Sequence, residues 1–178
     1  MAMNGAIFFS SRYGSTAQYA NWIGAATALP VFDVNDANAD PTHYDFLVLG
    51  SPVIYHKLLI HKWVQRNLIR IEATPIIMFT VSGAPAGHKL DGWIAASLPR
   101  DFIARMNHVA LRGRQNPKEL NWYDRIMLII GGLRNPDPVA RREEMEGFDF
   151  MDKASIEPVV KLVHQFQSST QAPSKKVD

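Results

Sequence analysis

The chain contains no cysteine, and this absence removes several classes of function at once. Without thiols there is no cysteine nucleophile, no disulfide framework, no iron–sulfur cluster and no cysteine-ligated zinc. Long apolar runs are also lacking, because no stretch approaches the roughly 20 apolar residues that a spanning helix requires. The N-terminus shows no secretory pattern, since Ser10, Ser11 and Arg12 interrupt its first apolar run. We therefore expect a cytoplasmic protein.

The composition that remains is that of an ordinary globular domain. The 178 residues are 47% hydrophobic and 20% charged, which allows one buried core and excludes a disordered chain. Charge is uneven, because residues 112–134 contain five basic and two acidic side chains. Such a segment suits an anionic ligand, an acidic lipid surface or a merely solvated loop. No nucleic-acid-binding module accompanies it, so we expect no nucleic-acid partner.

Predicted strands and helices alternate along the chain. Short apolar runs predict strands at residues 5–9, 31–34, 45–50, 75–81 and 107–111. Apolar residues at helical spacing predict helices at residues 16–29, 58–71, 93–106 and 157–167, with the third disturbed near Pro99. This alternation predicts an α/β fold in which a doubly wound, five-stranded parallel sheet is covered on both faces.

One segment stands outside this alternation. Residues 121–133 predict an additional helix after the fifth strand, within an inserted segment of about residues 112–135. We expect a single domain over residues 1–167. The polar residues 168–178 predict a disordered tail.

The first strand is followed by a loop rich in hydroxyl groups. Ser10, Ser11, Ser15 and Thr16 offer hydroxyls, and Gly14 permits a tight turn before a helix, at the strand edge where such sheets bind ligands. Capping of the helix explains the same residues equally well. The loop matches neither a P-loop nor a dinucleotide fingerprint, and it lacks the acidic residues of receiver domains and the cysteine of small phosphatases. A phosphate monoester held by hydroxyls and amides remains, which suits flavin mononucleotide (FMN).

Three segments carry a family resemblance. Ser-Ser-Arg-Tyr-Gly-Ser-Thr at residues 10–16 resembles the phosphate loop of flavodoxins, and more closely that of the menaquinone-dependent protoporphyrinogen dehydrogenase family, Ser-Thr-Arg-x-Gly-x-Thr. Leu-Gly-Ser-Pro-Val-Ile-Tyr at 49–55, and Ala-Leu-Arg-Gly-Arg at 110–114 followed by Trp-Tyr-Asp-Arg-Ile-Met-Leu at 122–128, strengthen the resemblance. It covers roughly residues 7–166 and is weak between 83 and 107. It implies a flavodoxin-like sheet with strand order 2-1-3-4-5.

The resemblance also implies an FMN site built from three loops. The phosphate would lie in the first loop and the isoalloxazine ring between the other two, where the Tyr55 ring would pack on the flavin. His56 stands where family members often carry glycine, which restricts backbone access to the flavin. The residues implied for the cofactor are Ser10, Ser11, Arg12, Tyr13, Gly14, Ser15, Thr16, Ser51, Pro52, Val53, Ile54, Tyr55, Val81, Ser82, Gly83 and Ala84.

The activity implied is an FMN-dependent oxidoreductase that dehydrogenates protoporphyrinogen IX, or a similar reduced substrate, and passes electrons to a quinone. Arg112, Arg114 and Arg125 would pair with propionate carboxylates, for which the arginine fork is suited. We expect no obligatory side-chain acid or base. We also expect no metal, because His56 and His61 are five residues apart and lack an acidic third ligand.

The inserted helix leaves alternatives open. Its apolar stretch, residues 126–130, suits a bilayer interface at the inner face of the cell membrane, a quinone, or a second subunit in a homodimer. A flavodoxin-type electron carrier without its own organic substrate is the alternative function.

Overall fold

The computed structural model describes residues 3–134 and 146–169, which are organised by one parallel sheet. Its long strands lie in the order β2-β1-β3-β5-β6. This confirms the predicted order 2-1-3-4-5, in which the fourth and fifth strands correspond to β5 and β6. The numbers differ because the short β4 (Lys57–Leu58), which pairs antiparallel with β3, was not counted. The five strands are β1 (Gly5–Phe9), β2 (Val31–Asp33), β3 (Phe46–Ile54), β5 (Ile76–Ser82) and β6 (Met106–Arg112).

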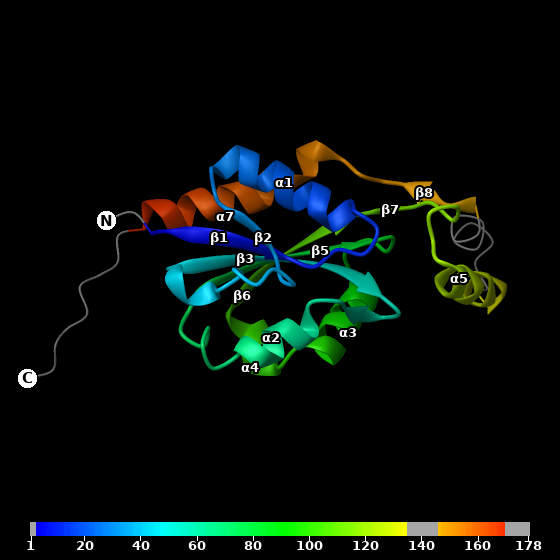
Figure 1. Cartoon of the computed structure of the whole chain (residues 1–178), viewed down its shortest axis with the longest axis horizontal. Coiled ribbons are helices and arrows are strands. Elements are labelled where there is room, and N and C mark those ends of the chain that lie inside the picture. The colour runs from blue at the N-terminus through cyan, green and yellow to red at the C-terminus, as the bar shows by residue number, and fades with distance from the viewer. Residues whose placement is uncertain (1–2, 135–145, 170–178) are drawn as a thin grey trace, which may run out of the picture.

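Helices cover both faces of the sheet (Figure 1). Successive β1 residues Ala6, Ile7 and Phe8 are all fully buried, but Ile7 belongs to one core and its two neighbours to the other. Side chains alternate between the faces of a strand, so a sheet buried on both sides reads as a continuous apolar run. One face carries α1 (Ser15–Thr27) and α7 (Glu157–Ser168), and the other carries α2 (His61–Asn67), α3 (His88–Ser97) and α4 (Arg100–Arg105).

Two predicted helices are wrong in extent. In the first, predicted at residues 58–71, a hairpin turn at Tyr55 and His56 brings Leu58 back beside Val53, so α2 begins only at His61. Both turn residues have positive φ, 50° and 62°, as the favoured two-residue hairpin turn requires.

The second, predicted at residues 93–106, is divided into α3 and α4 at Pro99. Proline lacks the N–H that a continuing helix needs and forces the preceding Leu98 into extended backbone. In addition, α3 begins at His88, before the predicted start, and the last predicted residue, Met106, already belongs to β6.

The predicted additional helix is confirmed as α5 (Trp122–Arg134). It lies beyond the carboxyl edge of the sheet, beside a small antiparallel pair formed by β7 (Arg114–Gln115) and β8 (Phe148–Asp149) (Figure 1). This pair was not predicted, because two-residue strands leave no periodic pattern. The predicted end of the inserted segment at residue 135, and tail residues 170–178, lie outside the described residues. Within the described residues no helix has the length and apolarity to cross a membrane.

Close packing in the sheet gives a testable prediction. A Cβ added at Gly50 would lie 2.3 Å from the ring of buried Phe79. We expect Gly50→Ala to lower the free energy of unfolding by about 1–3 kcal/mol through overpacking. Gly92→Ala is the matched control, because Gly92 is an exposed residue of helix α3 with no atom within 4 Å of its added Cβ. It should raise stability by about 0.5–1 kcal/mol. Equal urea midpoints for the two variants would contradict this packing.

Candidate functional site

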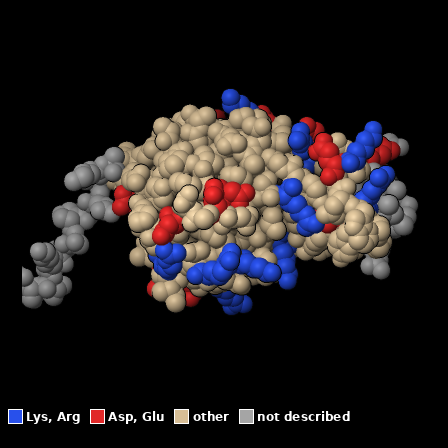
Figure 2. All heavy atoms as spheres, viewed as in Figure 1, with Lys and Arg blue, Asp and Glu red and all other residues tan. Residues whose placement is uncertain are grey.

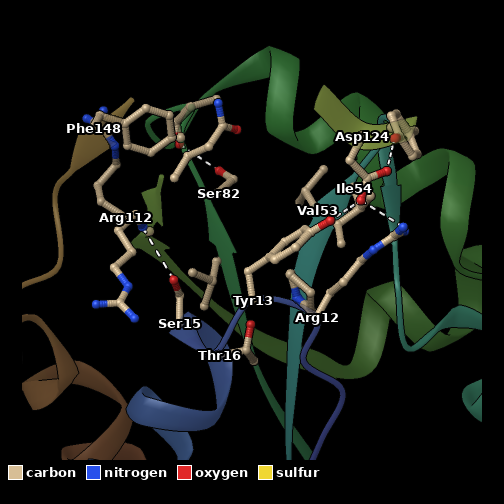
Figure 3. Close-up of a pocket in the computed structure, with 18 of the residues that line it drawn as sticks. Arg12, Tyr13, Ser15, Thr16, Val53, Ile54, Ser82, Arg112, Asp124 and Phe148 are labelled. Carbon is tan, nitrogen blue, oxygen red and sulfur yellow. Dashed lines mark hydrogen bonds and ion pairs between the residues drawn. The ribbon is translucent and has the colours of Figure 1, made fainter. Parts of the chain in front are cut away.

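A cavity of about 510 Å³ opens at the carboxyl edge of the sheet (Figure 3). Its walls come from the loop after β1, the β3–β4 hairpin, the loop after β5, the segment after β6 and helix α5. Thirteen of the residues predicted for the cofactor line it: Ser11, Arg12, Tyr13, Ser15, Thr16, Pro52, Val53, Ile54, Tyr55, Val81, Ser82, Gly83 and Ala84. The predicted residues Ser10, Gly14 and Ser51 lie beside the cavity without lining it.

Unpartnered polar atoms lie on the first loop and on the last residue of β6. Among the described residues, the buried Ser10 Oγ, Thr16 Oγ1 and Arg112 Nε have no hydrogen-bond partner. Leaving a buried polar group unsatisfied costs about 1–3 kcal/mol, so three such atoms at one sheet edge indicate a polar ligand.

The N-terminus of α1 also lacks a side-chain partner. Gly14 precedes the helix with a left-handed φ of 87°, and no side chain caps the helix N-terminus. The first turn of α1 contains no acidic residue. The N–H groups and the dipole of a helix N-terminus attract anions, so this end of the cavity suits a phosphate. The alternative in which the loop hydroxyls cap the helix is not what the structure shows.

The wall opposite is mostly apolar and contains one residue that sequence reasoning missed. A Cβ added at Gly83 would lie 2.5 Å from the ring of Phe148, so this ring packs directly on the loop after β5. Phe148 arrives from β8, far along the chain, and nothing in the sequence signalled it. Ser51 is turned away from the cavity, because its hydroxyl donates to the Pro52 carbonyl and accepts from the Ile60 amide.

Asp124 is the second residue that sequence reasoning missed. Its carboxylate, only 7% exposed, accepts hydrogen bonds from the hydroxyls of Tyr13 and Tyr55 and lies 2.7 Å from Nη2 of Arg12 (Figure 3). Arg12 was predicted on the phosphate, and the structure instead pairs it with α5. Burial, and then the hydrogen bond to Asp124, raises the pKa of both phenols above the ordinary value.

The predicted substrate arginines divide into two groups. Arg112 and Arg114 line the cavity, and the Arg112 guanidinium lies 4.1 Å from the ring centroid of Phe150. Arg125 is exposed and does not line the cavity. Basic and acidic side chains are interspersed at the end of the molecule that carries α5 (Figure 2). The basic segment therefore does not form a surface of one sign in this view.

The β3–β4 hairpin adds an aromatic stack at the cavity rim. The His56 ring lies parallel to the Trp93 indole, with centroids 5.1 Å apart, and Lys89 Nζ lies 5.4 Å from the same indole. The Trp93 side chain is partly buried, packs against the core on one face of the sheet and lines the cavity.

The topology and this cavity define a doubly wound α/β protein with its ligand site at the carboxyl ends of the strands. The family described as Flavodoxin domain matches residues 6–130, and the chain therefore belongs to that family.

The solved structures to which this chain is similar are distant in sequence. A flavodoxin, WrbA-like protein from Agrobacterium tumefaciens is 13% identical, with 93% of this chain and 99% of that chain covered and a TM-score of 0.47. A flavoprotein from Lactobacillus acidophilus, crystallised in complex with FMN, is 16% identical, with 62% and 93% covered and a TM-score of 0.46. No curated protein matches the chain. The family assignment therefore rests on the family match alone.

The Asp124 contacts predict a pH dependence. Ionising Tyr55 would place a phenolate beside the carboxylate, so the stabilisation from this bond is present below pH about 10 and is lost as pH rises through the raised pKa. When phenolate absorbance is followed against pH, a fraction of the tyrosine should ionise above the ordinary pKa, and Tyr55→Phe should make this fraction smaller. Asp124→Asn should shift the ionisation of this fraction to lower pH. Ionisation of every tyrosine in one step at the ordinary pKa would contradict the geometry.

Proposed function

We propose that this protein is an FMN-dependent oxidoreductase. The observation that carries the proposal is the set of unpartnered buried atoms, Ser10 Oγ, Thr16 Oγ1 and Arg112 Nε, beside the uncapped start of α1. Two hydroxyls, a guanidinium N–H and helix amides are the donors that a phosphate monoester needs. Membership of the flavodoxin domain family supports FMN as the bearer of that phosphate.

The other half of the cavity suits the flavin ring. Pro52, Val53 and Ile54 face it from the β3 end, and Val81 to Ala84 face it from the β5 end. Apolar walls bind a planar ring and limit the access of water, while nearby backbone groups offer hydrogen bonds. Bound FMN would supply the redox chemistry, and the residues of this chain would hold and orient it.

We further propose a reduced, carboxylate-bearing substrate, with a quinone as the electron acceptor. Protoporphyrinogen IX is the substrate that the family resemblance in residues 10–16, 49–55 and 110–128 favours. Arg112, Arg114 and Lys89 line the cavity, whereas the charge of Asp124 is already paired with Arg12. Basic side chains in the lining outnumber the acidic ones, Asp124 and Glu119, and this net positive charge favours a ligand that carries carboxylates.

Contact with a membrane surface is part of this proposal, since quinones dissolve in the bilayer. Trp122, Tyr123 and Ile126 of α5 are exposed, by 75%, 50% and 47% of their surface, and Lys118 is exposed nearby in the chain. Aromatic and aliphatic side chains with a neighbouring cation suit the interface of an anionic bilayer. A homodimer through the same face is the competing arrangement, and sedimentation with and without vesicles separates the two.

The alternative function is an electron carrier of the flavodoxin type, which family membership favours. The visible spectrum of the purified protein, with mass identification of the released cofactor, tests FMN binding. Oxidation of protoporphyrinogen IX with a quinone acceptor then tests the enzyme. FMN binding with electron exchange to redox proteins, but without oxidation of any organic substrate, would support the carrier. Protein that cannot be reconstituted with FMN would reject both functions.

The phosphate subsite gives a direct prediction. Thr16→Ala removes a hydroxyl whose hydrogen bond to a charged acceptor is worth about 1.5–3 kcal/mol. We expect FMN affinity, measured by flavin fluorescence, to fall by roughly one to two orders of magnitude with folding little changed. Thr27→Ala is the matched control, because Thr27 bonds the Ile23 carbonyl at the opposite end of the same helix. Unchanged affinity in Thr16→Ala would show that this hydroxyl does not hold the phosphate.

The arginines give a second prediction. Arg114→Gln should lower turnover of an anionic substrate and its sensitivity to salt, because the charge near the cavity is reduced. Arg112→Gln should lower FMN content as well, because Arg112 Nε is a proposed phosphate donor. Arg125→Gln should leave turnover in solution unchanged, since its side chain lies outside the cavity lining. FMN content is measured in parallel. Loss of FMN in Arg114→Gln would assign that residue to the cofactor, and full FMN content in Arg112→Gln would remove Arg112 from the phosphate subsite. Unchanged turnover per bound FMN in both variants would contradict the substrate proposal.

A further inference from the structure

Three side chains from two separate loops converge on one carboxylate of the inserted helix. Arg12 and Tyr13 belong to the loop after β1, and Tyr55 belongs to the β3–β4 hairpin. All three line the cavity, and all three contact Asp124 of α5 (Figure 3). The carboxylate is therefore the point at which the two loops and the inserted helix are joined.

Asp124 is held by hydrogen bonds at both its backbone and its carboxylate. Its backbone N–H donates to Oδ1 of Asn121 over 2.8 Å, which fixes the first turn of α5. Its negative charge lies in that first turn, where the helix dipole stabilises it. A buried carboxylate is costly unless paired and hydrogen-bonded, and here both oxygens are occupied. The three donors consequently have one well-defined arrangement.

The same contacts decide what Arg12 does. Its guanidinium points to Asp124 and away from Thr16, which lies on the other side of the first loop (Figure 3). The atoms left without partners near the start of α1 are instead Ser10 Oγ, Thr16 Oγ1 and Arg112 Nε. The phosphate subsite thus has its own donors, and the charge of Arg12 is used elsewhere.

Tyr55 depends most on this carboxylate. Its backbone has a φ of 50°, which a non-glycine residue adopts only under local constraint, and half of its side chain is exposed. Its ring makes an edge-on contact with Tyr123 of α5, with centroids 6.4 Å apart. The hydroxyl bond to Asp124 is therefore the polar contact that holds the ring over the cavity.

We propose that Asp124 is a positioning residue for the ring half of the cavity. It holds Tyr13, Tyr55 and Arg12 together as one wall for a bound flavin ring. The inference rests on the proposed function, since it assumes that the ligand is a flavin. It separates ring recognition, which depends on α5, from phosphate recognition, which depends on the start of α1.

The test compares FMN with riboflavin, which lacks the phosphate. Asp124→Asn keeps the shape of the side chain but places an N–H₂ against donors and removes the charge that pairs with Arg12. We expect the affinities for both flavins to fall by the same factor, roughly tenfold, so that their ratio is unchanged. Iodide should quench the fluorescence of bound flavin more strongly than in the parent protein. Asp101→Asn, at an exposed residue in the first turn of α4, is the matched control.

Tyr55→Phe provides an independent variant in case Asp124→Asn does not fold. It removes one donor, and we expect a smaller, equal loss of affinity for both flavins with increased quenching. Thr16→Ala should differ by weakening FMN but not riboflavin, because it alters only the phosphate subsite.

Each other outcome overturns the inference in a recognisable way. A higher FMN-to-riboflavin ratio in Asp124→Asn would mean that Asp124 competes with the phosphate for Arg12. A change in urea midpoint without a change in affinity or quenching would mean that Asp124 only stabilises the fold. If the parent protein binds neither flavin, the proposed function fails together with this inference, whereas normal binding in every variant overturns the inference alone.

Discussion

Parallel pairing of the central strands is the constraint on which the rest of this molecule depends. β1 pairs with β3 and β3 pairs with β5, all in the same direction, so the loops that follow them leave the sheet at one edge. These loops contribute residues 10–16, the hairpin at 55–56 and residues 82–85. The chain therefore assembles a cavity from segments that are far apart in sequence without any dedicated binding domain.

The same edge is where the fold leaves polar groups unsatisfied. Away from it, the strands bury apolar side chains on both faces, and their backbone groups are paired in the sheet. At the carboxyl edge of the sheet, Ser10 and Thr16 carry buried hydroxyls without hydrogen-bond partners, and α1 starts without a cap. Such groups lower the stability of the ligand-free protein, and a phosphate would satisfy them together. The unpaired polar groups thus lie where the proposed function places the cofactor phosphate.

The inserted segment joins this site through one buried carboxylate and through the apolar side chains of Leu120 and Met127, which line the cavity. Helix α5 leaves Trp122, Tyr123 and Ile126 exposed, while its single buried charged group, among the side chains that the structure describes, is Asp124. That carboxylate faces the cavity and holds residues of two loops. Among its described side chains, the helix therefore presents Asp124 to the site and Trp122, Tyr123 and Ile126 to the outside. This is consistent with an element that serves both a bound ligand and a larger surface, as the proposed function requires.

The sequence by itself determined the parallel sheet, its strand order and the loops that meet at its edge. A strand buried on both faces must be apolar throughout, and Ser10, Ser82 and Gly113 mark where β1, β5 and β6 end. β3, in contrast, continues through Gly50, Ser51 and Pro52 to Ile54. The sequence did not determine the Tyr55–His56 hairpin, because neither residue is the glycine or asparagine that normally signals such a turn.

Only the tertiary structure decided which charged residues of the inserted segment face the cavity. Asp124 and Arg125 are neighbours on α5, and a helix turns adjacent side chains by about 100°, so one faces the site and the other faces solvent. Nothing local fixes that rotation, since both residues are charged and the helix is apolar on more than one side. It is fixed by Tyr13, which lies 111 positions away in the chain and reaches Asp124 only after the sheet has folded.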